Sequence, residues 1–198
     1  MTGRRRIGVF GGAFDPPHIG HRVVAQDVLE RLHLDQLLVV PTAHPVHRET
    51  SLSAGLRLEL TRVAFADADR IDVSDIEFEN DRPSYMVETL ESIRDRQGAA
   101  DLWLIIGSDQ YAVFETWNEP ERILELAQLA VMKRGEDTIQ PDPRFPYTSV
   151  DVTRIDVSGQ AIRRRIALGQ SIKYLVPESV FAGIESNLEH VTGSIEAC

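Results

Sequence analysis

The chain has 198 residues, 42% of them hydrophobic and 26% charged, and a formal net charge of −10 at pH 7. This length supports one domain with a substantial core, and the acidic balance disfavours a nucleic-acid-binding surface, which is normally basic. Cys198 is the only cysteine, which excludes an intrachain disulfide and a cysteine-based zinc site and favours a reducing, cytoplasmic location.

Short apolar runs alternate along the chain with segments of helical period. No run reaches the roughly 20 apolar residues of a membrane span, and the apolar stretch near the N-terminus is too short for a secretory signal. The strands expected in chain order are 6–10, 36–41, 71–78, 101–107, 128–134 and 149–157. The helices expected are 18–34, 54–66, 84–97, 119–127, 159–169 and a last one from 177, with polar loops at 42–53 and 135–147. This alternation predicts an α/β fold, with a doubly wound parallel sheet covered by helices on both faces.

The stretch "GVFGGAFDPPHIGH" joins the first strand to the first helix. Gly11 and Gly12 fall at the carboxyl end of the strand, where they allow the backbone to turn tightly and approach a ligand. His18 and His21 share one face of the first helical turn, together with free backbone N–H groups and the positive end of the helix dipole. The stretch is neither a dinucleotide G-x-G-x-x-G element nor a P-loop, yet it predicts a phosphate-handling site.

The run His18-Ile19-Gly20-His21 within "GGAFDPPHIGH" closely resembles the signature of the HxGH-type nucleotidyltransferases. The resemblance implies a Rossmann-like nucleotidyltransferase fold over a single domain, residues 1–198, with a small C-terminal helical portion. It also implies that the two histidines bind the α-phosphate of a nucleoside triphosphate while a substrate phosphate attacks it. "HIGH" also marks class I aminoacyl-tRNA synthetases, but neither their K-M-S-K-S-like element nor a tRNA-binding domain is visible in this acidic chain.

Within that superfamily, residues 6 to 184 most resemble the nicotinate mononucleotide adenylyltransferases, which make a dinucleotide in NAD synthesis. The segments that carry the resemblance beyond the first motif are "HPVHR", "PSYMVETL", "IIGSDQ", "FETW" and "VSGQAIRRR". The chain departs from the family pattern at three places: Arg48 replaces a lysine, Met86 replaces a threonine, and Gly159-Gln160 stand within a Ser-Ser-Thr-like motif.

The resemblance implies two sets of site residues and three catalytic groups, namely His18, His21 and Arg163. The implied ATP-binding set is Gly11, Gly12, Ala13, Phe14, His18, His21, Gly107, Asp109, Ser158 and Arg163. The implied mononucleotide-binding set is Asp15, His47, Arg48, Tyr85, Met86, Trp117 and Arg134. No protein ligand for a metal is expected, so Mg²⁺ would be carried by the phosphates of ATP.

Three of these positions also make physical sense by themselves. Asp109 follows a buried strand, where its carboxylate could accept two ribose hydroxyls; the alternative is a helix N-cap that serves only the fold. Trp117 offers a flat face to a heteroaromatic ring, but a partly buried core tryptophan would have the same sequence. Arg163 lies one turn into a helix, where its guanidinium and the backbone amides would converge on triphosphate oxygens.

The reaction expected is direct in-line attack of the mononucleotide phosphate on the α-phosphorus of ATP, because no nucleophile is placed for a covalent intermediate. The expected partners are ATP and nicotinate mononucleotide, with no nucleic acid and no membrane, and a homo-oligomer is left open. Met86 keeps nicotinamide mononucleotide adenylyltransferase, or dual specificity, as an alternative. Pantetheine-phosphate adenylyltransferase and a non-catalytic nucleotide sensor are weaker alternatives.

Overall fold

The computed structural model describes residues 3–46, 49–79, 82–134 and 139–196. Six strands form one sheet in the order β3-β2-β1-β4-β5-β6, and every neighbouring pair is parallel. The strands are β1 Arg5–Gly12, β2 Gln36–Pro41, β3 Ile71–Val73, β4 Ala100–Gly107, β5 Ala127–Arg134 and β6 Tyr147–Val152. The predicted parallel α/β fold is confirmed.

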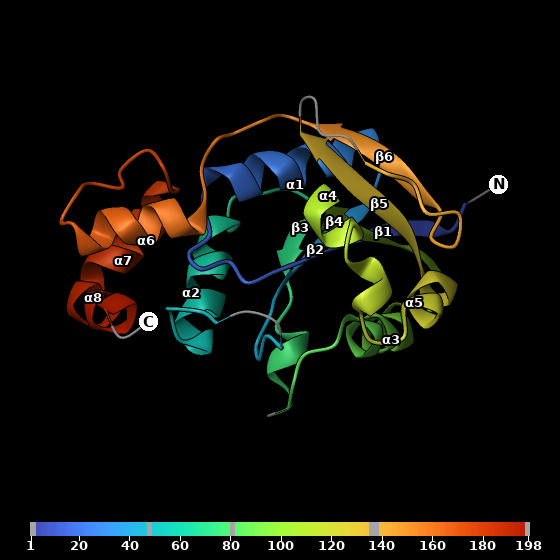
Figure 1. Ribbon diagram of the computed structural model, residues 1–198, viewed down its shortest axis with the longest axis horizontal. Helices are drawn as coiled ribbons and strands as arrows, with labels where there is room; N and C mark the ends of the chain where they lie inside the picture. Colours follow the sequence, from blue (N-terminus) through green and yellow to red (C-terminus); the bar gives the residue numbers. More distant parts are fainter. Residues whose placement is uncertain (1–2, 47–48, 80–81, 135–138, 197–198) are drawn as a thin grey trace.

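Helices cover both faces of this sheet (Figure 1). The α-helices are α1 Ile19–Arg31, α2 Ala54–Ala64, α3 Met86–Gln97, α4 Ser108–Tyr111, α5 Pro120–Leu126, α6 Gly159–Ala167, α7 Glu178–Ser186 and α8 Leu188–Glu196, and two short 3-10 helices are η1 Ile76–Phe78 and η2 Phe114–Thr116. Helices α1 and α2 share an apolar cluster with one face, whereas α3 and α5 pack on the other. None of the helices in the described part of the chain is long and apolar enough to cross a membrane.

The strand sequences explain why both faces are covered. Side chains alternate between the two faces of a strand, so Val9 belongs to the cluster under α3 and α5, while Phe10 belongs to the cluster under α1. The central strand β4 is buried continuously from Leu102 to Ile106, as strands with helices on both sides must be. A continuous apolar run is therefore the sequence signature of this sheet.

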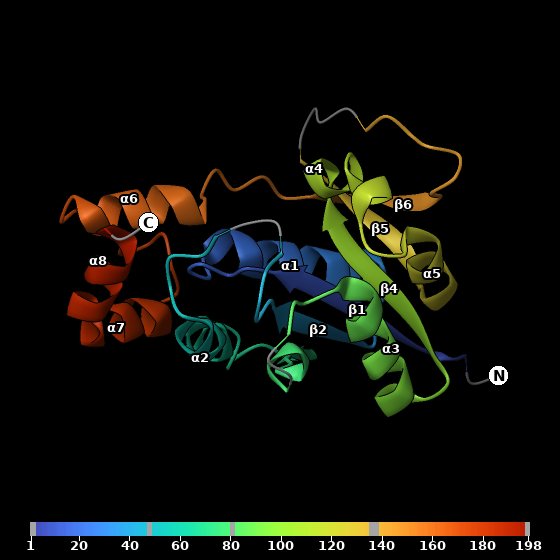
Figure 2. The same ribbon diagram turned by 60° about the horizontal axis from the view of Figure 1, so that its bottom comes forward.

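The C-terminal helices form a group at one end of the molecule, beside α2 (Figures 1 and 2). Helix α7 lies so close to α2 that a Cβ at Gly183 would fall 2.7 Å from Cδ2 of Leu60. The predicted C-terminal helical portion is thus packed onto the same apolar cluster as α1 and α2. That residues 1–198 form a single domain stays a prediction.

Three predicted elements differ from the structure. The strand expected at 71–78 is only three residues long, because β3 is an edge strand and the chain turns after Val73 into η1. The strand expected at 149–157 ends at Val152, since its partner β5 ends opposite this residue at Arg134. The last helix expected begins at Glu178 with Pro177 as its N-cap rather than in its first turn, and α8 follows it unpredicted.

Candidate functional site

The sheet order places a topological switch point between β1 and β4. Strand β1 pairs with β2 on one side and with β4 on the other, so the connections that leave β1 and β4 diverge. Phe10 pairs with Ile105, which brings Gly12 and Gly107 to the same carboxyl edge of the sheet. Ligands of doubly wound proteins bind in the crevice at such a point. The structure therefore brings together two sequence-predicted segments that lie about 95 residues apart.

The two glycines that end β1 are closely packed against neighbouring side chains. A Cβ at Gly11 would lie 2.7 Å from Cε of Met86, and one at Gly12 would lie 3.1 Å from the ring of Phe14. Phe14 is buried and has φ of 48°, a left-handed conformation that side chains seldom adopt. Such backbone strain persists only where the surroundings hold it, and it concentrates at functional sites.

The two histidines at the start of α1 are stacked on each other. Their ring centroids are 3.7 Å apart and the planes are inclined by only 21°. His18 is the N-cap of the helix and is 8% exposed, and its backbone N–H donates to Nδ1 of His21 at 3.2 Å. When neutral, the His21 ring therefore carries its proton on Nε2, which is the donor it can offer to a phosphate.

The glycine of the H-x-G-H motif lies directly against this histidine pair. A Cβ at Gly20 would be 3.1 Å from both Nδ1 and Cε1 of His18. A side chain there would press on the imidazole, so the glycine preserves the stacked arrangement. Packing thus gives a reason for the glycine of the motif.

Arg163 and Ser158 come to the same region from α6. Ser158 is the N-cap of that helix, and its Oγ accepts a hydrogen bond from Ala161 N. The Arg163 guanidinium donates to the backbone oxygen of Asp15 at 2.5 Å and lies 3.3 Å from the Asp15 carboxylate. A Cβ at Gly159 would fall 2.6 Å from the same backbone oxygen, so this departure from the family pattern permits close approach of α6 to the turn.

Asp15 is buried and faces the polar loop of residues 42–53 rather than solvent. Its carboxylate accepts hydrogen bonds from Ser51 N at 2.8 Å and from Leu52 N at 3.0 Å. These contacts give Asp15 a bridging position between the glycine-rich turn, the loop and Arg163. Its predicted contact with the mononucleotide stays a prediction.

Arg57 is a residue that the sequence analysis missed. It is 1% exposed, and its guanidinium donates to backbone oxygens of both the glycine-rich turn and the 42–53 loop. Burial lowers the pKa of Arg57 from its usual value, while the charges of Asp15 and Glu77 act against this shift. The available signal was an arginine directly beside Leu56 on the apolar face of a predicted helix.

Glu77 lies next to this loop, on the 3-10 helix η1. Its carboxylate accepts hydrogen bonds from Thr89 Oγ1 at 2.9 Å and from Ala43 N at 3.3 Å. Burial raises the pKa of Glu77 above its usual value, while hydrogen bonds from Ser84 and Thr89 and the charge of Arg57 act to lower it. The sequence carried no motif that pointed to this carboxyl group.

The segment that leaves β4 carries the remaining predicted residues. A Cβ at Gly107 would collide with the Asp109 carboxylate, so the glycine lets the exposed Asp109 side chain turn back toward the strand end. Trp117 is half-buried and packs on Phe114, with ring centroids 5.3 Å apart. Tyr85 and Met86 pack against the same apolar cluster as Trp117.

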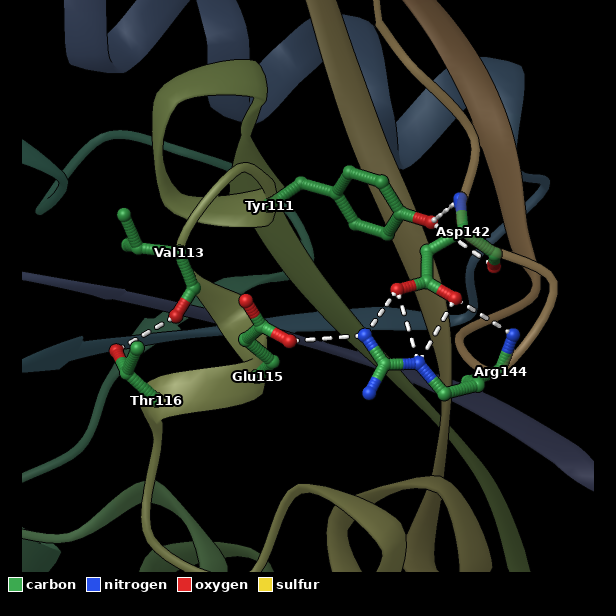
Figure 3. Close-up of polar contacts among 6 residues, drawn as sticks. All are labelled: Tyr111, Val113, Glu115, Thr116, Asp142 and Arg144. Atoms are coloured by element: carbon green, nitrogen blue, oxygen red, sulfur yellow. Dashed lines mark hydrogen bonds and ion pairs between the residues drawn. The ribbon is translucent and has the colours of Figure 1, made fainter.

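Polar contacts tie the segment after β4 to the loop before β6 (Figure 3). The Tyr111 hydroxyl donates to Phe145 O at 2.8 Å and accepts from Asp142 N at 3.1 Å. The Arg144 guanidinium bridges Glu115 and Asp142, and its hydrogen bonds hold the pKa of Asp142 below the usual value. These contacts involve residues on both sides of Phe114 in the segment that leads to Trp117, which directly follows the 3-10 helix η2.

For three of the predicted site residues, the structure describes no side chain. His47 and Arg48 lie outside the described residues. Arg134 ends β5, and its side chain is likewise outside what the structure describes. Within the described ranges, no three His, Cys, Asp or Glu side chains are grouped so that they could hold a metal ion.

Comparisons with known proteins agree with this geometry. Residues 9–165 match the model of the cytidylyltransferase-like family. A sequence from Exiguobacterium sibiricum, named a probable nicotinate-nucleotide adenylyltransferase, is 38% identical over 182 residues, which cover 91% of this chain and 96% of that protein. A protein of the same name from Thermus thermophilus is also 38% identical, over 92% of this chain and 97% of its own length.

Solved structures share the fold. The nicotinic acid mononucleotide adenylyltransferase of Plasmodium falciparum complexed with NaAD superposes with a TM-score of 0.78, covering 95% of this chain and 98% of that one at 16% identity. Fold and family model together define a nucleotidyltransferase of the Rossmann-like type. With relatives of 36–38% identity over most of its length, the chain belongs to the nicotinate-nucleotide adenylyltransferases, enzymes of NAD biosynthesis.

Proposed function

We propose that the stacked histidines, the glycine-rich turn and Arg163 form the site in which ATP reacts with nicotinate mononucleotide. A phosphate oxygen of the mononucleotide attacks the α-phosphorus of ATP in line with the bond to the β-phosphate. That bond breaks, pyrophosphate leaves with the electron pair, and nicotinate adenine dinucleotide is formed. No covalent enzyme intermediate is needed, since the attacking phosphate is already ionised at neutral pH.

The observation that carries this proposal is the stacked pair His18 and His21 at the N-terminus of α1. Imidazole N–H groups there, together with the helix dipole, favour the charge that grows on the α-phosphate in the transition state. Arg163 approaches from α6 and supplies a guanidinium for the phosphate tail. Catalysis is then positioning and charge stabilisation, as in phosphoryl transfer generally.

The other predicted contacts complete the proposed site. Gly107 and Asp109 would hold the ribose of ATP, and Ser158 the phosphate tail. His47, Arg48 and Arg134 would bind phosphate or carboxylate groups, while Tyr85, Met86 and Trp117 would form the wall against the pyridine ring. Mg²⁺ bound to the ATP phosphates would neutralise charge on pyrophosphate as it leaves. A cytoplasmic location fits the reducing setting predicted from the sequence.

The test is pyrophosphate release by the purified protein with Mg-ATP and one acceptor at a time. Nicotinate mononucleotide, nicotinamide mononucleotide and phosphopantetheine are compared at equal concentration. We expect the nicotinate form to give the highest kcat/KM. No turnover with any acceptor, alongside measurable ATP binding, would contradict the proposal and favour a nucleotide sensor.

Met86 is the reason to keep the nicotinamide form as a second candidate. Its Cε lies against Gly11, and it has no hydroxyl with which to recognise a carboxylate. The variant Met86→Thr restores the residue expected from the family pattern. If the amide form is a good substrate because of Met86, the variant should shift the ratio of the two kcat/KM values toward the acid.

A further inference from the structure

The guanidinium of Arg57 joins two chain segments that build the proposed site. Its Nη1 donates to Ala13 O at 2.8 Å and to Thr42 O at 2.6 Å, the first in the glycine-rich turn and the second just after β2. Its Nη2 donates to Ala43 O at 3.1 Å and its Nε to Leu52 O at 3.2 Å. All three nitrogens of one buried side chain are therefore bound to backbone oxygens.

Asp15 extends this arrangement to a third segment. The backbone of Leu52 is held at both of its peptide groups, since its N–H donates to the Asp15 carboxylate and its C=O accepts from Arg57. Asp15 in turn receives the Arg163 guanidinium at both its backbone oxygen and its carboxylate. A continuous chain of contacts thus runs from Arg57 through Leu52 and Asp15 to Arg163.

The position of this chain of contacts determines which parts of the candidate site would move with it. Ala13 lies between Gly12 and the strained Phe14, so a movement of its carbonyl would rotate the adjoining peptide groups of the turn. The same movement would pass through Asp15 to the position of the Arg163 guanidinium. Lysine could not replace Arg57 here, because one ammonium cannot reach four carbonyls from the several directions that a planar fork serves.

We propose that Arg57 is a positioning residue for adenylyl transfer, which acts by fixing the glycine-rich turn and, through Asp15, Arg163 in the reactive arrangement. This inference rests on the proposed function of that site. Arg57 does not touch substrate in this role. The competing explanation is that Arg57 only stabilises the fold.

The experiment compares Arg57→Lys with Arg62→Lys in the full-length protein. Arg62 lies on the same helix, but its side chain is 51% exposed and pairs with Asp75 on the surface, which makes it a matched control. For each protein, kcat and the KM for ATP and for nicotinate mononucleotide are measured, and kcat is expressed per folded molecule. The folded fraction at the assay temperature is taken from the thermal unfolding curve.

We expect Arg57→Lys to lower kcat per folded molecule by about 10- to 100-fold, since small displacements of catalytic groups cost rates of this order. The KM for ATP should change less than kcat, and Arg62→Lys should match the parent. If Arg57→Lys keeps kcat within about threefold of the parent, however far its Tm falls, Arg57 serves stability alone and the inference is wrong.

A second variant keeps the inference testable if the lysine variant does not fold. Arg57→Gln retains an amide donor at lower volume and without charge, and the same criterion applies to its folded fraction. Failure of the proposed function has a different signature, because the parent itself would then release no pyrophosphate with nicotinate mononucleotide. An active parent with an equally active Arg57 variant contradicts only the inference.

Discussion

The two halves of the candidate site are held by different kinds of charged contact. Around the glycine-rich turn, buried charged groups are bound to backbone atoms: Arg57 to four carbonyls, and Asp15 to two N–H groups. Around the segment that leaves β4, the ion pairs are between exposed side chains, as Arg144 with Glu115 and Asp142 shows (Figure 3). The first half is fixed by buried charged groups, and the second by exposed ion pairs together with the buried Tyr111 hydroxyl, which bonds to backbone atoms of Asp142 and Phe145.

This difference matches what each half is proposed to bind. Phosphate chemistry depends on donors placed to within fractions of an ångström, and buried hydrogen bonds to backbone atoms hold such positions. A flat aromatic wall tolerates small lateral shifts, because offset-stacked rings are favourable over a range of about 4.5–7 Å between centroids. Exposed ion pairs contribute little to stability, and a stacking wall needs no stronger support than they give.

The largest effect is expected in the buried half, at His18. Replacing His18 with alanine should lower kcat by about 10²–10³, because in the proposed mechanism this histidine donates to the α-phosphate in the transition state. Pyrophosphate release at saturating substrates measures this effect. The control is His33→Asn, since His33 is exposed in the turn that follows α1. Turnover of His18→Ala within about threefold of the parent would show that the histidine does not act on phosphate.

A smaller effect is expected at Trp117, in the other half. Trp117→Ala should raise the KM for nicotinate mononucleotide by about tenfold, because a base stacked on an aromatic ring gains roughly 1–3 kcal/mol. Trp117→Phe keeps an aromatic face and should stay close to the parent. The KM for ATP should not move in either variant. Equal KM values for the mononucleotide in all three proteins would remove Trp117 from the proposed pyridine wall.

Glu77 gives a pH test of the buried half. Because burial raises its pKa in the folded state above the usual 4.5, the folded protein holds this proton more tightly than the unfolded chain does. The contribution of Glu77 to stability is therefore greatest below pH 4.5 and is lost as pH rises through the folded-state pKa. Relative to Glu77→Gln, which does not titrate, the parent's free energy of unfolding should fall as pH rises from about 4.5. Urea unfolding of both proteins across this range measures the difference, and a constant difference would contradict the prediction.

The smallest effect is expected at Arg144, on the exposed surface. Arg144→Ala should lower Tm by no more than about 2 °C, and the shift should shrink further at high salt, since exposed pairs are screened. Arg154→Ala, which breaks a separate exposed pair with Asp156, should behave alike. A clear rise in the KM for nicotinate mononucleotide in Arg144→Ala alone would mean that these surface contacts position Trp117, and would weaken the contrast between the two halves.

The sequence was most informative where function and structure are both local. The glycines, His18 and His21 lie within one short stretch, so their roles in a strand, a turn and a helix start could be predicted together. The strand alternation likewise predicted the parallel sheet, because burial on both faces demands continuous apolar runs. The family resemblance drawn from the same stretch is confirmed by relatives that share 36–38% of their residues with this chain.

By itself, then, the sequence determined the fold class and the family, and it located the histidine motif that is proposed to bind phosphate, because each is written in neighbouring residues. Only the tertiary structure decided that Arg57, Asp15 and Arg163 form one chain of contacts, and that Glu77 lies half-buried beside the same loop. It also decided that β3 stops after three residues at the sheet edge. These features depend on which strands become neighbours and which segments meet at the sheet's carboxyl edge. Contacts between residues so far apart in the chain leave no local sequence pattern. Most of the partner atoms are backbone atoms, which every residue possesses.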